Sequence, residues 1–151
     1  EPRFNYIADN FDPLRKVYPF LDERSYQPLI GRPLSEIRCP CGEHDSYSDH
    51  FLEPFLDALA RLGIDVEVEK ADQLYKSGRM NPYIIMALEG RDRIAEILRA
   101  QTGKQVSSEW SPFNPLCPSC GKMPSRCCSW PQRQQRHRKK LTPHAPWAIA
   151  M

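Results

Sequence analysis

Two cysteines and two histidines lie within one short segment of the chain, between residues 39 and 50. Thiolates and imidazoles are ligands that zinc prefers in proteins, and four of them complete a tetrahedral site. Pro40 and Gly42 stand between the ligands, where a short loop allows the side chains to converge. An amphipathic segment follows directly, so a metal ion there would clamp the loop to the start of a helix. We therefore expect Cys39, Cys41, His44 and His50 to form a structural zinc site. The alternative is a loop that binds no metal.

A second pair of cysteines, Cys117 and Cys120, lies in the sequence Cys-Pro-Ser-Cys-Gly. This spacing is typical of half a zinc ribbon or knuckle, because a tight turn lets both thiolates face one ion. Redox-active dithiols share the spacing, but this pair lies in a proline-rich loop and not at an evident helix start, which would lower the thiol pKa. A complete metal site needs two further ligands, and the downstream candidates are Cys127, Cys128, His137 and His144.

Polar residues follow the first predicted strand, which covers residues 4–8 and is short, aromatic and β-branched. We expect this strand to be buried. Open α/β sheets bind ligands at the carboxyl ends of their strands, so Asp9, Asn10 and Asp12 are candidate substrate-binding residues. The alternative is a capped turn, because these residue types also favour turns for local reasons.

The most regular helical pattern follows the Cys/His segment, and Gly63 is a suitable end for it. We expect this helix to begin at about His50, which places Pro54 near the first turn, where a proline is tolerated. Residues 64–69 then alternate polar and apolar side chains, which predicts a half-exposed strand. The apolar residues that share one face of the helix are Leu52, Phe55, Leu56, Leu59 and Leu62.

Two more helical segments follow. Residues 71–75 predict a helical turn, and a longer helix is expected from Asn81 to Gly103. Asn81 would be its N-cap, with Pro82 at the first helical position, and Gly90 is a point where it could break. The order of helix, strand and helix predicts an α/β fold.

The composition limits the class of protein. The chain has 151 residues, 40% of them hydrophobic, which is enough for one ordinary core. No apolar run approaches the roughly 18 residues that a membrane span needs. The chain begins at Glu1 without an initiator Met or a signal-peptide pattern, so we expect it to start inside a longer protein. Paired cysteines near histidines favour metal over disulfides, and therefore a reducing, cytoplasmic setting.

The excess positive charge belongs to the end of the chain. Residues 123–151 contain six Lys or Arg and no acid, whereas the rest contains 15 basic and 19 acidic residues. This distribution argues against a uniformly basic nucleic-acid-binding protein. The proline-rich tail from residue 124 is expected to be disordered, and the functional alternative is a basic arm that contacts RNA phosphates.

Several blocks of sequence, in the same order, resemble class I lysyl-tRNA synthetases, the form common in archaea and some bacteria. The resemblance extends from about Tyr6 to Lys122. The blocks are Tyr-Ile-Ala-Asp-Asn-Phe-Asp-Pro-Leu-Arg-Lys-Val at residues 6–17, His-Asp-Ser-Tyr-Ser-Asp-His-Phe at 44–51, Leu-Gly-Ile at 62–64, Leu-Tyr-Lys-Ser-Gly-Arg at 74–79, Trp-Ser-Pro at 110–112 and Cys-Pro-Ser-Cys-Gly at 117–121.

This resemblance implies part of a Rossmann-type catalytic domain with a zinc-bearing insertion that handles the tRNA acceptor end. The family activates lysine with ATP and Mg²⁺ as lysyl-adenylate and transfers it to tRNA-Lys, as a cytoplasmic enzyme expected to be a monomer. On this basis residues 1–32 would belong to the catalytic domain and residues 33–122 to the insertion, followed by the tail at residues 123–151. Asp9, Asn10 and Asp12 would face the substrate pocket, where an acidic side chain would neutralise the lysine ammonium or hold the active-site loop.

The resemblance also bears on the first metal site. Relatives carry Asp-Pro-x-Gly-Cys-His where this chain has Cys-Pro-Cys-Gly-Glu-His at residues 39–44. Cys39 therefore replaces the acidic residue, Glu43 replaces the usual cysteine, and Cys41 is a new thiol. The four ligands could include Cys41 or Glu43, and we favour Cys41 because zinc prefers thiolate over carboxylate here.

Two ATP-binding motifs of the family are absent from the sequence: a His-Ile-Gly-His-like motif and a Lys-Met-Ser-Lys-Ser-like loop. They are expected before Glu1 and after Met151. Without their charge stabilisation at phosphorus, we expect the chain by itself to be inactive. The pattern also ends near Lys122, which a frameshift or truncated gene would explain. The competing hypothesis is a stand-alone zinc-dependent RNA-binding module without catalysis.

Overall fold

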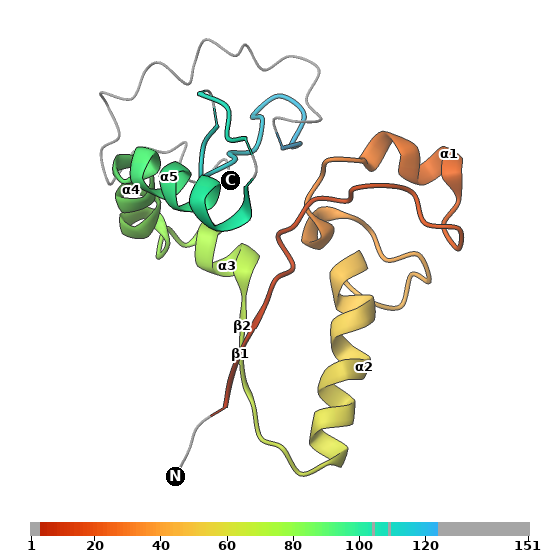
Figure 1. Cartoon of the computed structure of the whole chain (residues 1–151). Helices are drawn as coiled ribbons and strands as arrows, with labels where there is room; N and C mark the ends of the chain where they lie inside the picture. Colours follow the sequence, from red (N-terminus) through yellow and green to blue (C-terminus); the bar gives the residue numbers. More distant parts are fainter. Residues whose placement is uncertain (1–3, 104, 109, 124–151) are drawn as a thin grey trace.

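The computed structural model describes residues 4–103, 105–108 and 110–123, and its centre is a pair of parallel strands (Figure 1). Strand β1 (Asn5–Ala8) pairs with β2 (Glu67–Lys70) in a register that joins Asn5 to Glu67 and Ala8 to Lys70. Parallel strands cannot be joined by a tight hairpin, and the connection here contains helix α2. The mixed α/β content and the first strand are confirmed, whereas the second strand is shorter than predicted.

Helix α2 (Tyr47–Arg61) runs beside the strands (Figure 1). Its N-cap is Ser46, whose hydroxyl accepts a hydrogen bond from the backbone N–H of Asp49. The helix therefore begins well before Pro54, and the expectation that this proline lies near the first turn is wrong. Sequence spacing missed this start because the apolar stripe begins only at Leu52, six residues after the cap.

The expectation that β1 is a buried strand is also wrong. Of its four residues only Ala8 is buried, and Ile7 is 59% exposed. Successive side chains of a strand point to opposite faces of the sheet. The ring of Tyr6 lies 5.1 Å from that of Phe55 on α2, whereas the side chain of Ile7 belongs to the opposite face. The aromatic and β-branched composition predicted the strand correctly but not how much of it is covered.

Three helices follow β2: α3 (Ala71–Lys76), α4 (Asn81–Glu89) and α5 (Arg91–Thr102). The predicted helical turn is thus confirmed, and the long predicted helix breaks at Gly90, as its composition allowed. Gly103 ends α5 in the left-handed conformation at a φ of 65°. The prediction that Asn81 is an N-cap is wrong, because Met80 is the capping residue and Asn81 is the first helical residue.

The connection between β1 and α2 is folded on itself. It contains α1 (Glu23–Tyr26) and two 3-10 turns, η1 (Gln27–Leu29) and η2 (Leu34–Glu36). One hydrophobic cluster joins Leu14, Leu21, Tyr26 and Ile37 of this connection to Tyr47 of α2, and a second, smaller cluster joins Phe11, Ala71 and Leu116. Among the residues described, no helix combines the length and apolar character that a membrane crossing requires.

Candidate metal site

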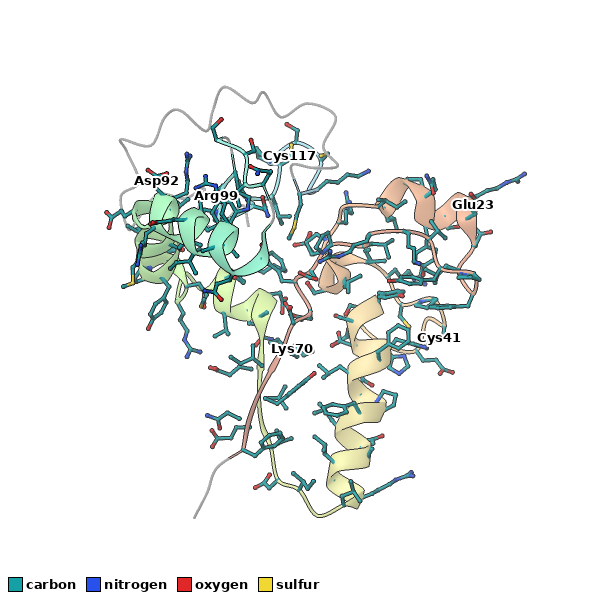
Figure 2. The ribbon with its side chains drawn as sticks, viewed as in Figure 1. Glu23, Cys41, Lys70, Asp92, Arg99 and Cys117 are labelled. Atoms are coloured by element: carbon teal, nitrogen blue, oxygen red, sulfur yellow. The ribbon has the colours of Figure 1, made fainter. Side chains whose placement is uncertain are left out.

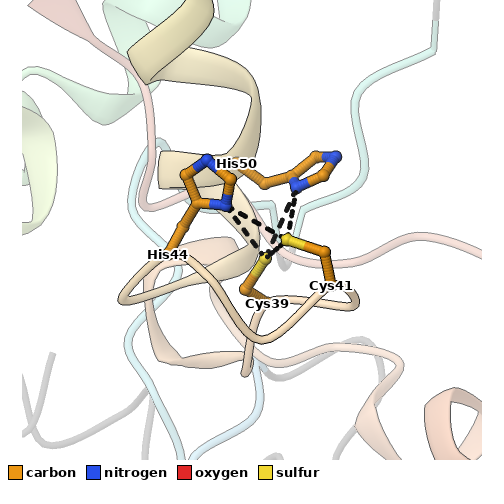
Figure 3. A group of neighbouring side chains, drawn as sticks. All are labelled: Cys39, Cys41, His44 and His50. Carbon is orange, nitrogen blue, oxygen red and sulfur yellow. Dashed lines mark hydrogen bonds between the residues drawn. The ribbon is translucent and has the colours of Figure 1, made fainter.

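The four predicted ligands of the first site lie together at the start of α2 (Figure 3). One ligand atom from each of Cys39, Cys41, His44 and His50 lies within 4.8 Å of the others. Both imidazoles turn Nδ1 towards the sulfurs, at 3.4 Å from Cys39 Sγ and 3.2 Å from Cys41 Sγ. In the part of the chain that the structure describes, this is the one such group of three or more His, Cys, Asp or Glu, and Glu43 is not in it.

A tight turn in the backbone brings the two thiols together. The N–H of Gly42 donates a hydrogen bond to the carbonyl of Cys39 at 3.3 Å, so Pro40 and Cys41 form the middle of the turn. Proline suits the second position of such a turn, and Gly42 adopts a φ of 79°, which strongly favours glycine. The loop then closes at Tyr47, whose N–H bonds to the carbonyl of Ile37 at 2.7 Å. The loop therefore places Cys39, Cys41 and His44 next to α2, which carries His50.

The hydrogen bonds within the cluster set the charge of its groups. Burial by itself raises the pKa of the Cys39 thiol, but hydrogen bonds from the Cys41 thiol and backbone and from His44 lower it to about 5. The same contact raises the pKa of Cys41, which donates to the Cys39 sulfur. The hydrogen bond with Cys39 also raises the pKa of His44. These hydrogen bonds therefore favour the thiolate form of Cys39, which is the form that binds a metal ion.

The dimensions of the cluster fit a tetrahedral zinc ion. Zn–S distances of about 2.3 Å and Zn–N distances of about 2.0 Å imply ligand separations of roughly 3.5–3.8 Å. The sulfur–nitrogen distances of 3.2–3.4 Å are close to this range, and the two sulfurs are closer, at 2.9 Å. A shift of less than about 1 Å therefore opens the site for the ion.

The second nitrogen of His44 faces an acid. Its Nε2 lies 3.7 Å from Glu53 Oε2, one turn further along α2 from His50. Histidines that bind metal through one ring nitrogen commonly direct the other towards a carboxylate, which fixes the tautomer and the ring orientation. Glu53 was not predicted from the sequence. Its position three residues after His50 on the same helix was the available signal.

The second cysteine pair lies far from the first in the sequence. Cys117 is buried, and Cys120 lies in the turn that follows it, where the Gly121 N–H bonds to the Cys117 carbonyl at 2.8 Å. The structure therefore forms the tight turn that a zinc knuckle needs. The four predicted downstream ligands, Cys127, Cys128, His137 and His144, lie outside the described residues.

The three predicted substrate-binding residues have different surroundings. Asp9 lines a pocket of about 270 Å³ at the end of β1, together with Tyr6 and other aromatic side chains. Partial desolvation, with the nearby charge of Asp12, raises the pKa of Asp9 although the residue is exposed overall. Asp12 instead pairs with Arg15 at 3.0 Å on the surface.

Asn10 also borders the pocket, but its amide is engaged with α3. The side-chain NH₂ donates to Asp72 Oδ1 at 2.7 Å, and its carbonyl oxygen accepts from the backbone N–H of Asp72 at 2.9 Å. This two-way bond joins the loop after β1 to the first turn of α3. Asn10 is 5% exposed and therefore acts as a buried tie between segments 62 residues apart.

Asp49 and Lys70 form a hydrogen-bonded ion pair that was not predicted from the sequence. Lys70 Nζ donates to Asp49 Oδ1 at 2.7 Å, and the hydroxyl of Ser46 donates to Asp49 Oδ2 at the same distance. Burial raises the pKa of Asp49, but these hydrogen bonds outweigh it and hold the pKa below the usual 3.8. The pattern Ser46-x-x-Asp49 is a capping-box signal that could have located this helix start. The lysine partner follows only from the tertiary structure.

Comparison with known proteins identifies the family. The family model described as tRNA synthetases class I (K) matches residues 1–135. The chain is 58% identical over 120 residues to a lysine–tRNA ligase of Methanosarcina barkeri, 50% identical over 125 residues to one of Archaeoglobus fulgidus, and 39% identical over 135 residues to one of Methanocaldococcus jannaschii. These matches cover 80%, 83% and 89% of this chain, and 22%, 25% and 25% of those relatives.

The chain therefore belongs to the class I (K) family of tRNA synthetases. It spans a quarter or less of the length of the curated relatives it matches. The resemblance inferred from the sequence blocks is confirmed, as is a mixed α/β fold with a small parallel sheet.

Proposed function

We propose that this chain is a segment of a lysine–tRNA ligase, which uses ATP and Mg²⁺ to attach lysine to tRNA-Lys in the cytoplasm. The observation that carries the proposal is the 58% identity over 120 residues to the Methanosarcina barkeri lysine–tRNA ligase. The family model matches residues 1–135, which include β1, the Cys/His segment at residues 39–50 and the helices around them. A monomeric full-length enzyme fits the proposal.

Within this function, Cys39, Cys41, His44 and His50 would hold a structural zinc ion. Four protein ligands leave no open position for a substrate, so the ion would supply a cross-link and no Lewis-acid chemistry. Three of the ligands lie on the loop and His50 lies on α2, so the ion would fix the loop to the helix. Cys117 and Cys120 would contribute half of a second site.

The pocket at the end of β1 is our candidate for substrate binding in a Rossmann-type catalytic domain. Asp9 lines it and carries a carboxylate that can pair with an ammonium group. Asn10 would shape the pocket through its bond to Asp72, and Asp12 would act at its rim. We retain the boundaries of the proposed zinc-bearing insertion at residues 33–122, with residues 123–151 as a tail.

A chimeric enzyme tests this function directly. Residues 4–123 would replace the aligned segment of the Methanosarcina barkeri ligase, and lysylation of tRNA-Lys would be followed with radioactive lysine. We expect the chimera to charge the tRNA, because the segments share most of their residues. A chimera that folds and retains zinc but does not form lysyl-tRNA contradicts the proposal.

Two variants of the chimera separate the roles of the acids. Asp9→Asn should raise the KM for lysine more than tenfold if its carboxylate pairs with the substrate ammonium, since charge-assisted hydrogen bonds contribute about 1.5–3 kcal/mol. Asp57→Asn is the control, because Asp57 is an exposed acid of α2 that does not line the pocket. Equal KM values for the two variants would remove Asp9 from the substrate site.

The alternative, a stand-alone zinc-dependent RNA-binding module, receives less support. The family model of class I (K) tRNA synthetases matches residues 1–135, which include β1 and the pocket as well as the Cys/His segment. The basic tail that would be its RNA contact lies outside the described residues.

A further inference from the structure

The sulfurs of Cys39 and Cys41 lie close enough to bond to each other. They are 2.9 Å apart, and one residue separates them in the chain. Two residues span at most about 7 Å between their Cα atoms, and disulfides form over Cα separations of about 4.4–6.8 Å. The turn closed by the bond from Gly42 N–H to the Cys39 carbonyl shortens this span. Little backbone movement therefore separates the two thiols from a disulfide.

The two thiols differ in their access to solvent. Cys41 is exposed, whereas Cys39 is 3% exposed. A small oxidant therefore reaches Cys41 first, and Cys39 lies behind it as the resolving thiol. The loop around them belongs to no helix or strand, and a Cβ added at Gly42 would meet nothing within 4 Å, so the turn has room to adjust.

We propose that Cys39 and Cys41 form an oxidation site, at which a peroxide converts the pair to a disulfide and expels the bound metal ion. Once deprotonated, as it is when it binds a metal ion, the exposed Cys41 thiolate attacks one oxygen of hydrogen peroxide, the O–O bond breaks, and hydroxide leaves to give a sulfenic acid. The Cys39 thiolate then attacks the Cys41 sulfur, and a second hydroxide leaves as the disulfide forms. Two thiolates lose two electrons in total, and one peroxide gains them.

The disulfide and the metal site exclude each other, because both require the two sulfurs. A metal ion joins the loop to α2 through His50, whereas the disulfide joins two residues of the same turn. Cross-links that close very short loops restrict the unfolded chain little. Oxidation therefore replaces a long-range connection with a local one, and it releases the loop from the helix.

This inference rests on the thiol geometry, and only its metal-release half rests on the proposed zinc site. Tryptic peptides allow disulfide formation to be measured separately from metal release. Trypsin cleaves after Arg38 and Arg61, so one peptide of residues 39–61 contains Cys39 and Cys41 and no other cysteine. Another peptide, residues 105–122, contains only Cys117 and Cys120 and reports on the second pair.

The experiment treats the purified, zinc-loaded chain with increasing hydrogen peroxide. Released zinc is measured with a chromophoric chelator, and the remaining thiols are alkylated before digestion and mass spectrometry. We expect peptide 39–61 to lose two hydrogens and escape alkylation as about one zinc per chain is released. Dithiothreitol should restore both thiols and, with added zinc, the metal content.

Two variants make the test specific. Cys41→Ser should form no disulfide within peptide 39–61 at any peroxide concentration. Cys120→Ser is the matched control, which removes one thiol of the other pair and should leave oxidation of peptide 39–61 unchanged.

Two results would contradict the proposal. If peptide 39–61 stays reduced at peroxide concentrations that fully oxidise peptide 105–122, the proposal is wrong. Direct conversion of Cys41 to sulfinic acid, without a disulfide, also overturns it. If the purified chain binds no zinc at this site, the metal-release half fails, and the mass of peptide 39–61 still decides whether the disulfide forms.

Discussion

Lys70, the last residue of β2, donates a hydrogen bond to the carboxylate of Asp49 in the first turn of α2, at 2.7 Å between Nζ and Oδ1. The carboxylate is 9% exposed and the lysine side chain 35%. The residue after Asp49 is His50, a proposed metal ligand. This ion pair therefore links the small sheet to the helix turn that presents the ligand (Figure 2 labels Lys70 and Cys41).

Replacing Lys70 should destabilise the fold. Lys70→Met leaves the Asp49 carboxylate buried without its charged partner. We expect the free energy of unfolding to fall by about 1–3 kcal/mol at neutral pH, which is less than for a fully buried pair because the lysine side chain is partly solvated. Arg79→Met is the control, because Arg79 and Glu69 form an exposed pair that contributes about 0–1 kcal/mol. Chemical denaturation measures the free energy of unfolding of both variants. An equal decrease in the two variants would mean that the Asp49–Lys70 pair stabilises the fold no more than an exposed ion pair does.

The cost of Lys70→Met should also depend on pH. In the native chain the pKa of Asp49 is held below 3.8, so the pair adds stability above about pH 4 and loses it as the pH falls through that lower pKa. The gap in unfolding free energy between native chain and variant should therefore narrow below about pH 4, when the carboxyl is protonated. A gap that stays constant from pH 7 to pH 3 would contradict this.

Asn10 should be needed for stability because of its two-way bond to Asp72. Asn10→Ala removes both hydrogen bonds and leaves the Asp72 N–H at the start of α3 without this acceptor, which should cost about 1–3 kcal/mol. Asp12→Asn, two residues away on the surface, should change the unfolding free energy by less than about 0.5 kcal/mol. If thermal denaturation ranks the two variants in the opposite order, Asn10 is not a structural tie.

Local sequence signals predicted the elements whose causes are local. The break at Gly90, the end at Gly103 and the extent of α3 follow from backbone preferences that one or two residues carry. The four Cys/His ligands lie within one short segment, so their meeting needed only a turn. The bonds from Asn10 to Asp72 and from Asp49 to Lys70 join residues 62 and 21 positions apart. No periodicity in the sequence encodes such contacts.

Pro54 shows where a local rule gave the wrong answer. A proline lacks the N–H that would bond to the carbonyl of His50, four residues earlier, yet α2 continues through it to Arg61. Pro54→Ala restores that bond and should raise the unfolding free energy by as much as about 3 kcal/mol. A lower Tm for Pro54→Ala than for the native chain, measured by circular dichroism, would show that the proline fits this helix better than the rule allows.

Glu53 should strengthen metal binding through His44. Glu53→Gln removes the carboxylate near His44 Nε2, and we expect metal affinity to fall by up to about tenfold, since the contact is 3.7 Å and partly exposed. Asp57→Asn, one turn further along α2, is the matched control and should leave the affinity unchanged. Competition with a chelator of known affinity measures both, and equal values would exclude a role for Glu53.

Zinc stoichiometry tests the central claim most directly, namely that Cys39, Cys41, His44 and His50 form one metal site. The measurement is elemental analysis of the purified native chain beside the variants His50→Ala and Cys120→Ser. We predict that His50→Ala contains about one zinc fewer per chain than the native protein, whereas Cys120→Ser keeps the ion at the first site. A zinc content that His50→Ala leaves unchanged would contradict the assignment.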